Sequence, residues 1–162
     1  MSNVTHAVNA SNDNIKHSAI ISFRRAIASD RDFLLNLRKA SMEKHLNNAG
    51  IYLDDNAHLQ RIDEFFADSH LILYKKRPVG LLKLGLFANK IHVRQFQLLP
   101  TFQGVGIGSK VLEVIKRKAQ EKRLNITLNV LINNPAKQLY LRHDFVVISS
   151  NELEFQMHWQ CQ

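Results

Sequence analysis

Three glycines alternate at the point where an apolar, strand-like run gives way to a helix-like segment. Gly104, Gly106 and Gly108 closely follow Leu98-Leu99-Pro100. The start of a helix presents backbone N–H groups without internal partners, and the helix dipole adds partial positive charge there. Glycine tolerates positive φ and removes Cβ atoms that would keep a large anion away. The turn is therefore suited to a phosphate or diphosphate, although a tight turn with a close packing contact would explain the same glycines.

Two common phosphate loops do not fit this turn. A Walker loop needs Lys followed by Ser or Thr after its last glycine, whereas Ser109-Lys110 has the reverse order. A dinucleotide fingerprint needs G-x-G-x-x-G after the first strand of a parallel unit, whereas at least three predicted strands come before this G-x-G-x-G.

A third pattern fits, and a second motif follows it. Residues 103–108 (QGVGIG) match Q/R-x-x-G-x-G/A, and residues 133–145 match N-x-x-A-x-x-L-Y-x-x-x-G-F except that Asp144 replaces the last glycine. Aspartate tolerates left-handed backbone better than most residues. The two motifs and the element order over residues 20–158 resemble the GNAT superfamily of N-acyltransferases. The stretch of residues 37–55 resembles segments of uncharacterised bacterial members of the superfamily. The resemblance implies an α/β (α+β) fold with a mixed, mostly antiparallel sheet flanked by helices on both faces.

The resemblance also implies an acetyl-CoA site. Backbone amides of the loop would bind the diphosphate, and the main chain at the end of the preceding strand would accompany the pantetheine arm. The two leucines there are equally explained as core, and the asparagine as a helix N-cap. The residues assigned to acetyl-CoA are Leu98, Leu99, Gln103, Gly104, Val105, Gly106, Ile107, Gly108, Ser109 and Asn133.

Tyr140 occupies the motif position that the family often uses as a general acid. A phenol with a pKa of about 10 is protonated at neutral pH and can donate to a departing thiolate; a ring packed in the core is the alternative. The base is less defined, because the strand IHVRQFQLL contains no acid. His92 is the tentative base, with a surface role as its alternative, and Glu43 and His45 are other candidates.

The function implied is transfer of an acetyl group from acetyl-CoA to a primary amine of a small molecule or protein, by direct attack in a ternary complex. The alternative is a catalytically inactive CoA-binding sensor or interaction module. A cationic amine would be attracted by Asp54 and Asp55, although these also suit a helix cap.

Composition limits the other classes. The 162 residues include 22 basic and 14 acidic side chains, a net charge of +8, and a single cysteine, Cys161. A lone cysteine excludes a disulfide framework, and we expect a cytoplasmic protein. We expect no metal, no membrane partner and no nucleic acid, since neither ligand spacings nor a recognition motif is present. A homodimer is a further expectation from the resemblance.

These residues must be positioned by alternating helices and strands. Residues 1–18 are polar and predict a disordered tail, and residues 19–162 predict one domain. A capping box at Ser29–Asp32 would start a first helix that stops at Gly50, and a second helix would carry Leu59, Ile62, Phe65 and Phe66. Pro135 opens a short helix to residue 143. Strands are predicted at 20–26, 71–75, 79–87, 91–99, 125–131, 145–148 and 153–158, with a further helix from 108 to 122.

Overall fold

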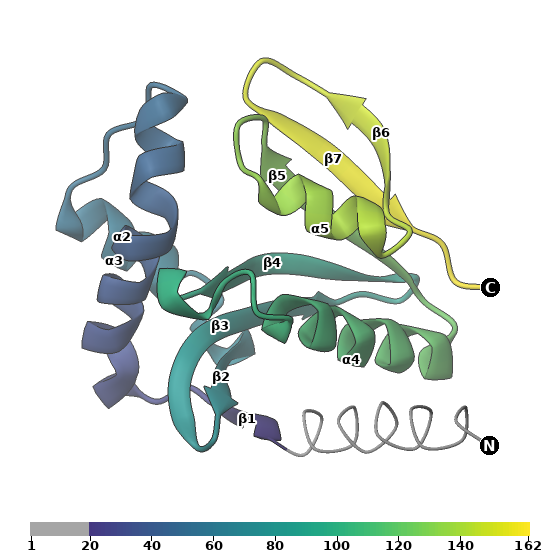
Figure 1. Cartoon of the computed structure of the whole chain (residues 1–162), viewed down its shortest axis with the longest axis horizontal. Coiled ribbons are helices and arrows are strands. Elements are labelled where there is room, and N and C mark those ends of the chain that lie inside the picture. Colours follow the sequence, from purple (N-terminus) through teal and green to yellow (C-terminus); the bar gives the residue numbers. More distant parts are fainter. Residues whose placement is uncertain (1–19) are drawn as a thin grey trace, which may run out of the picture.

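The computed structural model describes residues 20–162; the predicted tail of residues 1–18 lies outside them. One seven-stranded sheet organises this part of the chain (Figure 1). The elements, in chain order, are β1 (Ile21–Arg25), α2 (Arg31–Asn48), α3 (Asp55–Asp63), β2 (Ser69–Tyr74), β3 (Arg77–Leu86), β4 (Lys90–Leu98), α4 (Ile107–Lys122), β5 (Asn125–Leu131), α5 (Ala136–Arg142), β6 (Val146–Ser150) and β7 (Glu154–Trp159).

The sheet has the strand order β1-β2-β3-β4-β5-β7-β6, and its one parallel pair is β4 with β5. This pair is short: Lys90 to Val93 lie beside Asn125 to Leu128, and beyond them the two strands diverge (Figure 1). The later residues of β4 and β5 therefore have no strand partner on their facing edges. The predicted mixed, mostly antiparallel sheet is confirmed.

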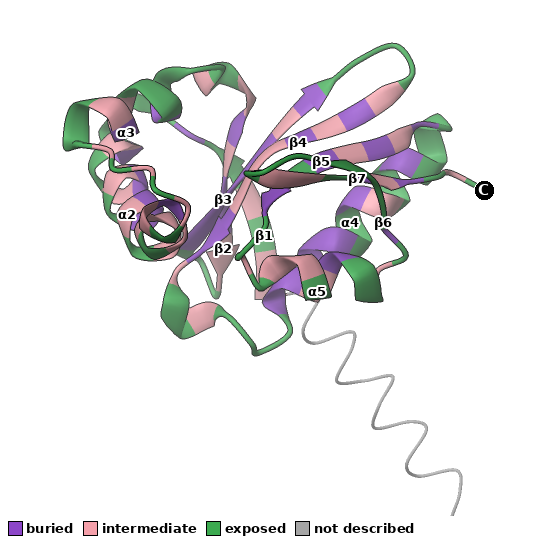
Figure 2. Ribbon diagram, turned by 90° about the horizontal axis from the view of Figure 1, so that it is seen from above, coloured by how far each residue is buried: buried purple, intermediate pink, exposed green. Residues whose placement is uncertain are grey.

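Helices cover both faces of the sheet, as predicted (Figure 2). On one face α2 and α3 bury a small core that includes Leu34, Leu37 and Ile62. On the other face α4 and α5 bury a larger core, to which α4 contributes Val111 and Ile115. The diverging ends of β4 and β5 lie between these helical layers.

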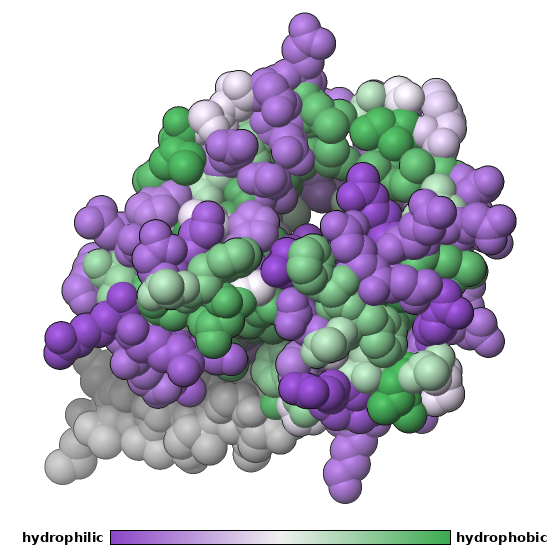
Figure 3. Space-filling view, turned by 180° about the vertical axis from the view of Figure 1, so that it is seen from behind, coloured by the Kyte–Doolittle hydropathy of each residue, from purple (hydrophilic) through white to green (hydrophobic). Residues whose placement is uncertain are grey.

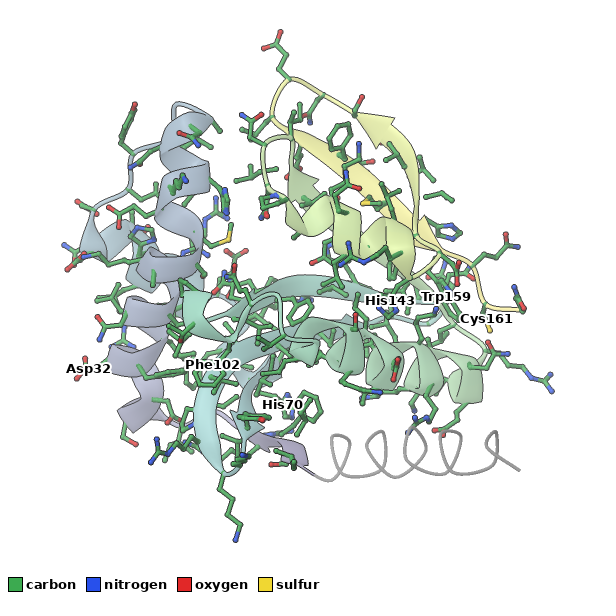
Figure 4. All side chains as sticks on the ribbon, viewed as in Figure 1. Asp32, His70, Phe102, His143, Trp159 and Cys161 are labelled. Carbon is green, nitrogen blue, oxygen red and sulfur yellow. The ribbon has the colours of Figure 1, made fainter. Side chains whose placement is uncertain are left out.

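The predicted start of the first helix is wrong. The capping acid is Asp30, which accepts 2.8 Å and 2.9 Å hydrogen bonds from both terminal nitrogens of Arg24 and one of 2.8 Å from the Ile27 amide. Asp32 instead points away from the body of the protein (Figure 4). The pattern failed because Arg24 comes from the preceding strand and supplies a charged partner to the other acid.

The second helix is shorter than predicted. It ends at Asp63, so Phe65 and Phe66 lie beyond it. Phe65 adopts left-handed backbone with φ 53°, and Phe66 begins a separate 3₁₀ turn, Phe66–Asp68. The buried Lys83 side chain explains the end, since its Nζ donates to the carbonyls of Arg61, Ile62 and Glu64 at 2.7–3.3 Å. A cation at these carbonyls satisfies the unpaired acceptors of a helix C-terminus.

Two other local predictions are confirmed. Gly50 follows α2 with φ 77°, and Asp144 follows α5 with φ 67°, the left-handed geometry in which the related motif places a glycine. Strand ends elsewhere agree with the predicted ranges within one or two residues, and the turn between β2 and β3 is formed by Lys75 and Lys76, both with positive φ.

Candidate active site

The three glycines of the loop have two different structural roles, which depend on their positions. Gly104 and Gly106 have φ of 72° and 92°, and a Cβ added to either would meet no atom within 4 Å. A Cβ on Gly108 would lie 3.0 Å from Leu139 Cδ2. The first two glycines therefore give the loop its left-handed turns and an open face, whereas the third allows α4 to pack closely on α5.

Consecutive backbone amides of this loop have no acceptor within the described chain. The Gln103 amide donates to Pro100 O at 3.2 Å and the Lys110 amide to Gly106 O at 3.2 Å, but the amides of residues 104–109 donate to no other described residue. The Gln103 side chain donates to Leu98 O at 2.9 Å, which ties the loop to the end of β4. A run of unpaired donors at a helix N-terminus is an anion-binding arrangement.

A donor-side cavity of about 430 Å³ lies against this open face. It extends from the loop toward the diverging strands, between α2 and α5. Its lining is Ser41, Met42, His45, Phe96, Gln97, Leu98, Gln103, Gly104, Gly106, Gly108, Ser109, Asn134, Pro135, Ala136, Leu139, Tyr140 and Arg142. Ser109 Oγ lies 3.0 Å from Nε2 of His143, and this hydrogen bond joins the first turn of α4 to the end of α5.

An acceptor-side cavity of about 310 Å³ lies on the other side of the divergence. The two cavities share residues, so they meet where β4 and β5 separate. The shared residues are Met42, Phe96, Gln97, Asn134, Ala136 and Tyr140. Figure 3 shows the molecule hollowed between its two lobes, with hydrophilic side chains around the opening. One compound can therefore enter from each side and meet the other at this junction.

Tyr140 lies at the junction. It is 6% exposed, lines both cavities, and packs its ring against Phe145 with centroids 5.7 Å apart. Its hydroxyl hydrogen bonds to no described residue. Burial raises the pKa of the phenol well above its ordinary value of 10.0, so the group is protonated at neutral pH and has a proton to donate.

The histidines divide between the cavities differently from the sequence prediction. His92 hydrogen bonds through Nδ1 to Thr127 Oγ1 at 2.8 Å and lines a third cavity with Lys83, outside the two that meet at Tyr140. His45 lines the donor-side cavity, and its buried Nδ1 has no partner among the described residues. Burial lowers the pKa of both imidazoles from 6.5, so both are neutral at neutral pH.

Some of the other residues predicted to bind acetyl-CoA line the donor-side cavity, and others do not. Leu98 and Ser109 line the donor-side cavity, whereas the Leu99 amide is bound to Val79 O at 2.9 Å. Val105 is exposed and the side chain of Ile107 belongs to the core, so both would contribute backbone only.

The predicted N-cap role of Asn133 is wrong, because Pro135 occupies the N-cap position of α5 and the neighbouring Asn134 makes the side-chain bond at the helix start. Asn134 Oδ1 accepts from the Ala136 amide at 2.9 Å, and Asn134 lines both cavities. Sequence reasoning missed this residue and also Phe96, Leu139 and Arg142. The motif marks α5 as a whole, and its helical period was the available signal for which side chains face the cavity.

The acids Asp54 and Asp55 are held by other contacts. Asp54 caps α3 by accepting from the Ala57 amide at 2.8 Å, and Asp55 pairs with Lys39 at 2.9 Å. Neither lines a cavity that meets at Tyr140. The helix-cap alternative therefore accounts for Asp54.

Comparison with known proteins gives the family. The family model described as an acetyltransferase (GNAT) domain matches residues 40–159 of the chain. The chain belongs to the GNAT acetyltransferase family. No curated protein matches it.

Solved structures share the GNAT fold. An acetyltransferase from Thermus thermophilus has a TM-score of 0.72 and 16% identity, covering 88% of this chain and 98% of its own. PaiA N-acetyltransferase from Thermoplasma acidophilum, in complex with coenzyme A, has a TM-score of 0.64 and 20% identity, covering 86% and 98%. Arabidopsis thaliana Naa50, with the bisubstrate analogue CoA-Ac-MVNAL, has a TM-score of 0.65 and 15% identity, covering 87% and 99%. These identities support the fold of the GNAT domain rather than a shared acceptor.

Two features are absent from the described part of the chain. No helix within residues 20–162 combines the length and apolarity that crossing a bilayer requires. In the same part of the chain, histidine, cysteine and carboxylate side chains do not gather in groups of three or more that would hold a metal ion.

Proposed function

We propose that this GNAT domain is an N-acetyltransferase that uses acetyl-CoA to acetylate a primary amine within a ternary complex. The observation that carries the proposal is the run of unpaired amides at residues 104–109, above a cavity that continues to Tyr140. Acetyl-CoA supplies the activated acetyl group as a thioester. The CoA-bound neighbour PaiA supports CoA as the carrier.

On the donor side, the diphosphate would accept hydrogen bonds from the amides of residues 104–109 at the start of α4. These amides and the dipole of the helix both favour an anion there. Arg142 lines the same cavity and provides a cation for the remaining phosphate charge. The pantetheine arm would follow the edge of β4 beyond Val93, where no strand partner competes for its amides.

At the junction, the amine nitrogen attacks the thioester carbonyl carbon. The new C–N bond forms as the C–S bond breaks, and the Tyr140 hydroxyl donates its proton to the departing thiolate. The nitrogen loses one proton to a base or to water, and the phenol regains one from solvent. Holding both reactants at one junction accounts for much of the rate through positioning.

The base is proposed as His45 or a water that it orients, with His92 as the alternative from the strand. His45 lines the cavity that contains Tyr140, is neutral at neutral pH, and has an unpartnered buried nitrogen. His92 lines the third cavity, so as the base it would have to act through water.

The alternative function is a CoA-binding module without catalysis, and no feature of the described residues favours it over the enzyme. Calorimetry with acetyl-CoA, followed by free-thiol release against a panel of amines, tests the proposal. We expect binding and amine-dependent thiol release. Binding without release for any amine supports the sensor, and absence of binding removes both. A bacterial source, a cytoplasmic location and a homodimer stay predictions.

A further inference from the structure

The acceptor-side cavity contains a buried guanidinium without an acidic partner. Arg38, on α2, lines this cavity and is 7% exposed. Its Nε donates to His58 Nδ1 at 3.1 Å, and this is its one hydrogen bond among the described residues. A histidine nitrogen that accepts a hydrogen bond is unprotonated, so His58 is neutral and does not balance the positive charge of Arg38.

Arg38 differs in this respect from the other arginines of the cavity. Arg61 Nη1 lies 3.6 Å from Glu64 Oε2, and Arg94 Nε lies 3.3 Å from Asp68 Oδ2. No described carboxylate lies within 4 Å of the Arg38 guanidinium. Burial and the nearby charge of Arg61 lower the pKa of Arg38 to about 10, which leaves it charged at neutral pH.

A buried, unpaired cation is costly, and the cost is relieved when an anion binds. The terminal nitrogens of a guanidinium form a planar fork that matches the two oxygens of a carboxylate. The single unpaired positive charge suits a monoanion, and the small volume suits a small molecule.

The same cavity offers acceptors for an ammonium group. Gln95 and Gln97 line it, and the Oε1 atom of each is buried without a partner in the described chain. The amide of Gln95 is oriented by its Nε2, which donates to Arg61 O at 3.2 Å, so its oxygen is the unpaired atom. Gln97 also lines the donor-side cavity, which places it at the junction with Tyr140.

We propose that the acceptor is a small amino acid, with its carboxylate bound by Arg38 and its amine held near Gln97 for acetylation. The inference rests on the proposed acetyltransferase function and narrows its acceptor to amines that carry a carboxylate. Among the described residues that line this cavity, Glu154 on β7 is the one acid, and it makes no ion pair with Arg38. Glu64 and Asp68 lie outside the lining and are paired with Arg61 and Arg94.

The test compares matched acceptors in the thiol-release assay. Each α- or ω-amino acid is paired with its carboxamide, and spermidine serves as a carboxylate-free amine. We expect kcat/KM for the best amino acid to exceed that of its carboxamide by about 100-fold, because the amide leaves the buried cation unpaired. An amino amide has the more readily deprotonated amine, so amine reactivity cannot produce this preference. Equal or better acetylation of carboxamides or spermidine would overturn the proposal.

Variants of Arg38 test whether this residue causes the preference for the amino acid over its carboxamide. We expect Arg38→Gln to bring the acid-to-amide ratio near one with unchanged acetyl-CoA affinity, and Arg38→Lys to reduce the ratio in part. Arg31→Gln is the matched control, since Arg31 lies on the same helix and pairs with Asp63 outside both cavities. A ratio that survives Arg38→Gln would contradict the assignment. Should that variant not fold, the wild-type ratio and the Arg38→Lys result still decide.

A separate binding measurement keeps the two proposals distinguishable. Calorimetry of the wild-type protein with CoA and an N-acetyl amino acid, against the matching N-acetyl amide, reads the carboxylate subsite without turnover. We expect binding of the acid to be at least about tenfold tighter. Tighter acid binding without thiol release would retain the subsite and remove the catalytic proposal. Thiol release with equal binding of acid and amide would do the reverse.

Discussion

The two cavities that meet at Tyr140 present different kinds of binding group, main chain in one and side chains in the other. The donor-side cavity depends on main chain, namely the amides of residues 104–109 and the edge of β4 beyond Val93. The acceptor-side cavity depends on side chains from separate elements, namely Arg38 on α2 and Gln95 and Gln97 on β4.

This difference predicts that the two sites respond differently to substitution. A main-chain site needs only glycines and a helix start, so many sequences can preserve it while their side chains vary. A side-chain site changes with each substitution, so acceptors can change without altering the fold. The predictions below test whether donor binding and acceptor binding are independent in this way.

The largest effect is expected at Gly106. Valine at φ 92° is strained and places a branched side chain on the open face of the loop. We expect Gly106→Val to weaken acetyl-CoA binding by at least about 100-fold, because losing even two charge-assisted hydrogen bonds costs several kcal/mol. Calorimetry measures the dissociation constant.

Gly50→Val is the control for backbone strain. Gly50 has φ 77°, no atom lies within 4 Å of its added Cβ, and it lies outside both cavities. We expect both variants to lose stability by about 1–2 kcal/mol, but only Gly106→Val to lose acetyl-CoA. Equal binding by the two variants would mean that the loop does not hold the donor.

The next effect is expected at Tyr140, where the two regions share a residue. Tyr140→Phe removes the donated proton and keeps the ring against Phe145. We expect kcat to fall by about 100-fold with unchanged acetyl-CoA affinity. Tyr74→Phe, the same change outside both cavities, is the control. If kcat is unchanged in Tyr140→Phe, the acid assignment fails.

A smaller effect is expected from the histidines. Since water can replace an imidazole in part, we expect His45→Gln to lower kcat by about tenfold and His92→Gln to have less effect. Burial lowers the pKa of His45, so the acidic limb of its rate profile would lie below pH 6.5 and disappear in His45→Gln. A larger loss in His92→Gln would favour the strand histidine as base.

The last effect concerns stability beside the acceptor-side cavity rather than binding or turnover. Burial and the charge of Arg38 lower the pKa of Lys83 from 10.5 to about 8. Between these values the unfolded chain binds a proton that the folded protein has released. Wild-type stability relative to Lys83→Met should therefore rise from pH 8 to 10.5, by at most about 1.4 kcal/mol per pH unit, and be constant below pH 8.

Urea denaturation across this pH range measures the difference, with the exposed Lys118→Met as control. A flat difference between wild type and Lys83→Met would show that Lys83 has an ordinary pKa in the folded protein. It would also mean that burial and the charge of Arg38 affect the pKa of Lys83 less than the geometry indicates.

Sequence reasoning predicted the fold and drew attention to the glycine loop that lines the donor-side cavity, because both are encoded locally. The hydrophobic periods of strands and helices, the three glycines and the L-Y pair are readable within short windows. The role of Arg38 on the acceptor side was not predictable in this way, since it depends on the burial of the guanidinium without a buried carboxylate beside it. The error at Phe65 has a similar cause, since Lys83, which is distant in sequence, binds the carbonyls at the end of α3. The errors at Ser29–Asp32 and Asn133 are instead local, because a neighbouring residue, Asp30 or Asn134, makes the hydrogen bond at the helix start.

The central claim is that the amides of residues 104–109 bind the diphosphate of the acyl donor. Titrating ¹⁵N-labelled protein with CoA and following each amide signal tests it directly. The account predicts large, saturable shifts for the signals of these residues and small ones for Gly50 and its neighbours. CoA binding that shifts other amides and leaves those of residues 104–109 unmoved would contradict it.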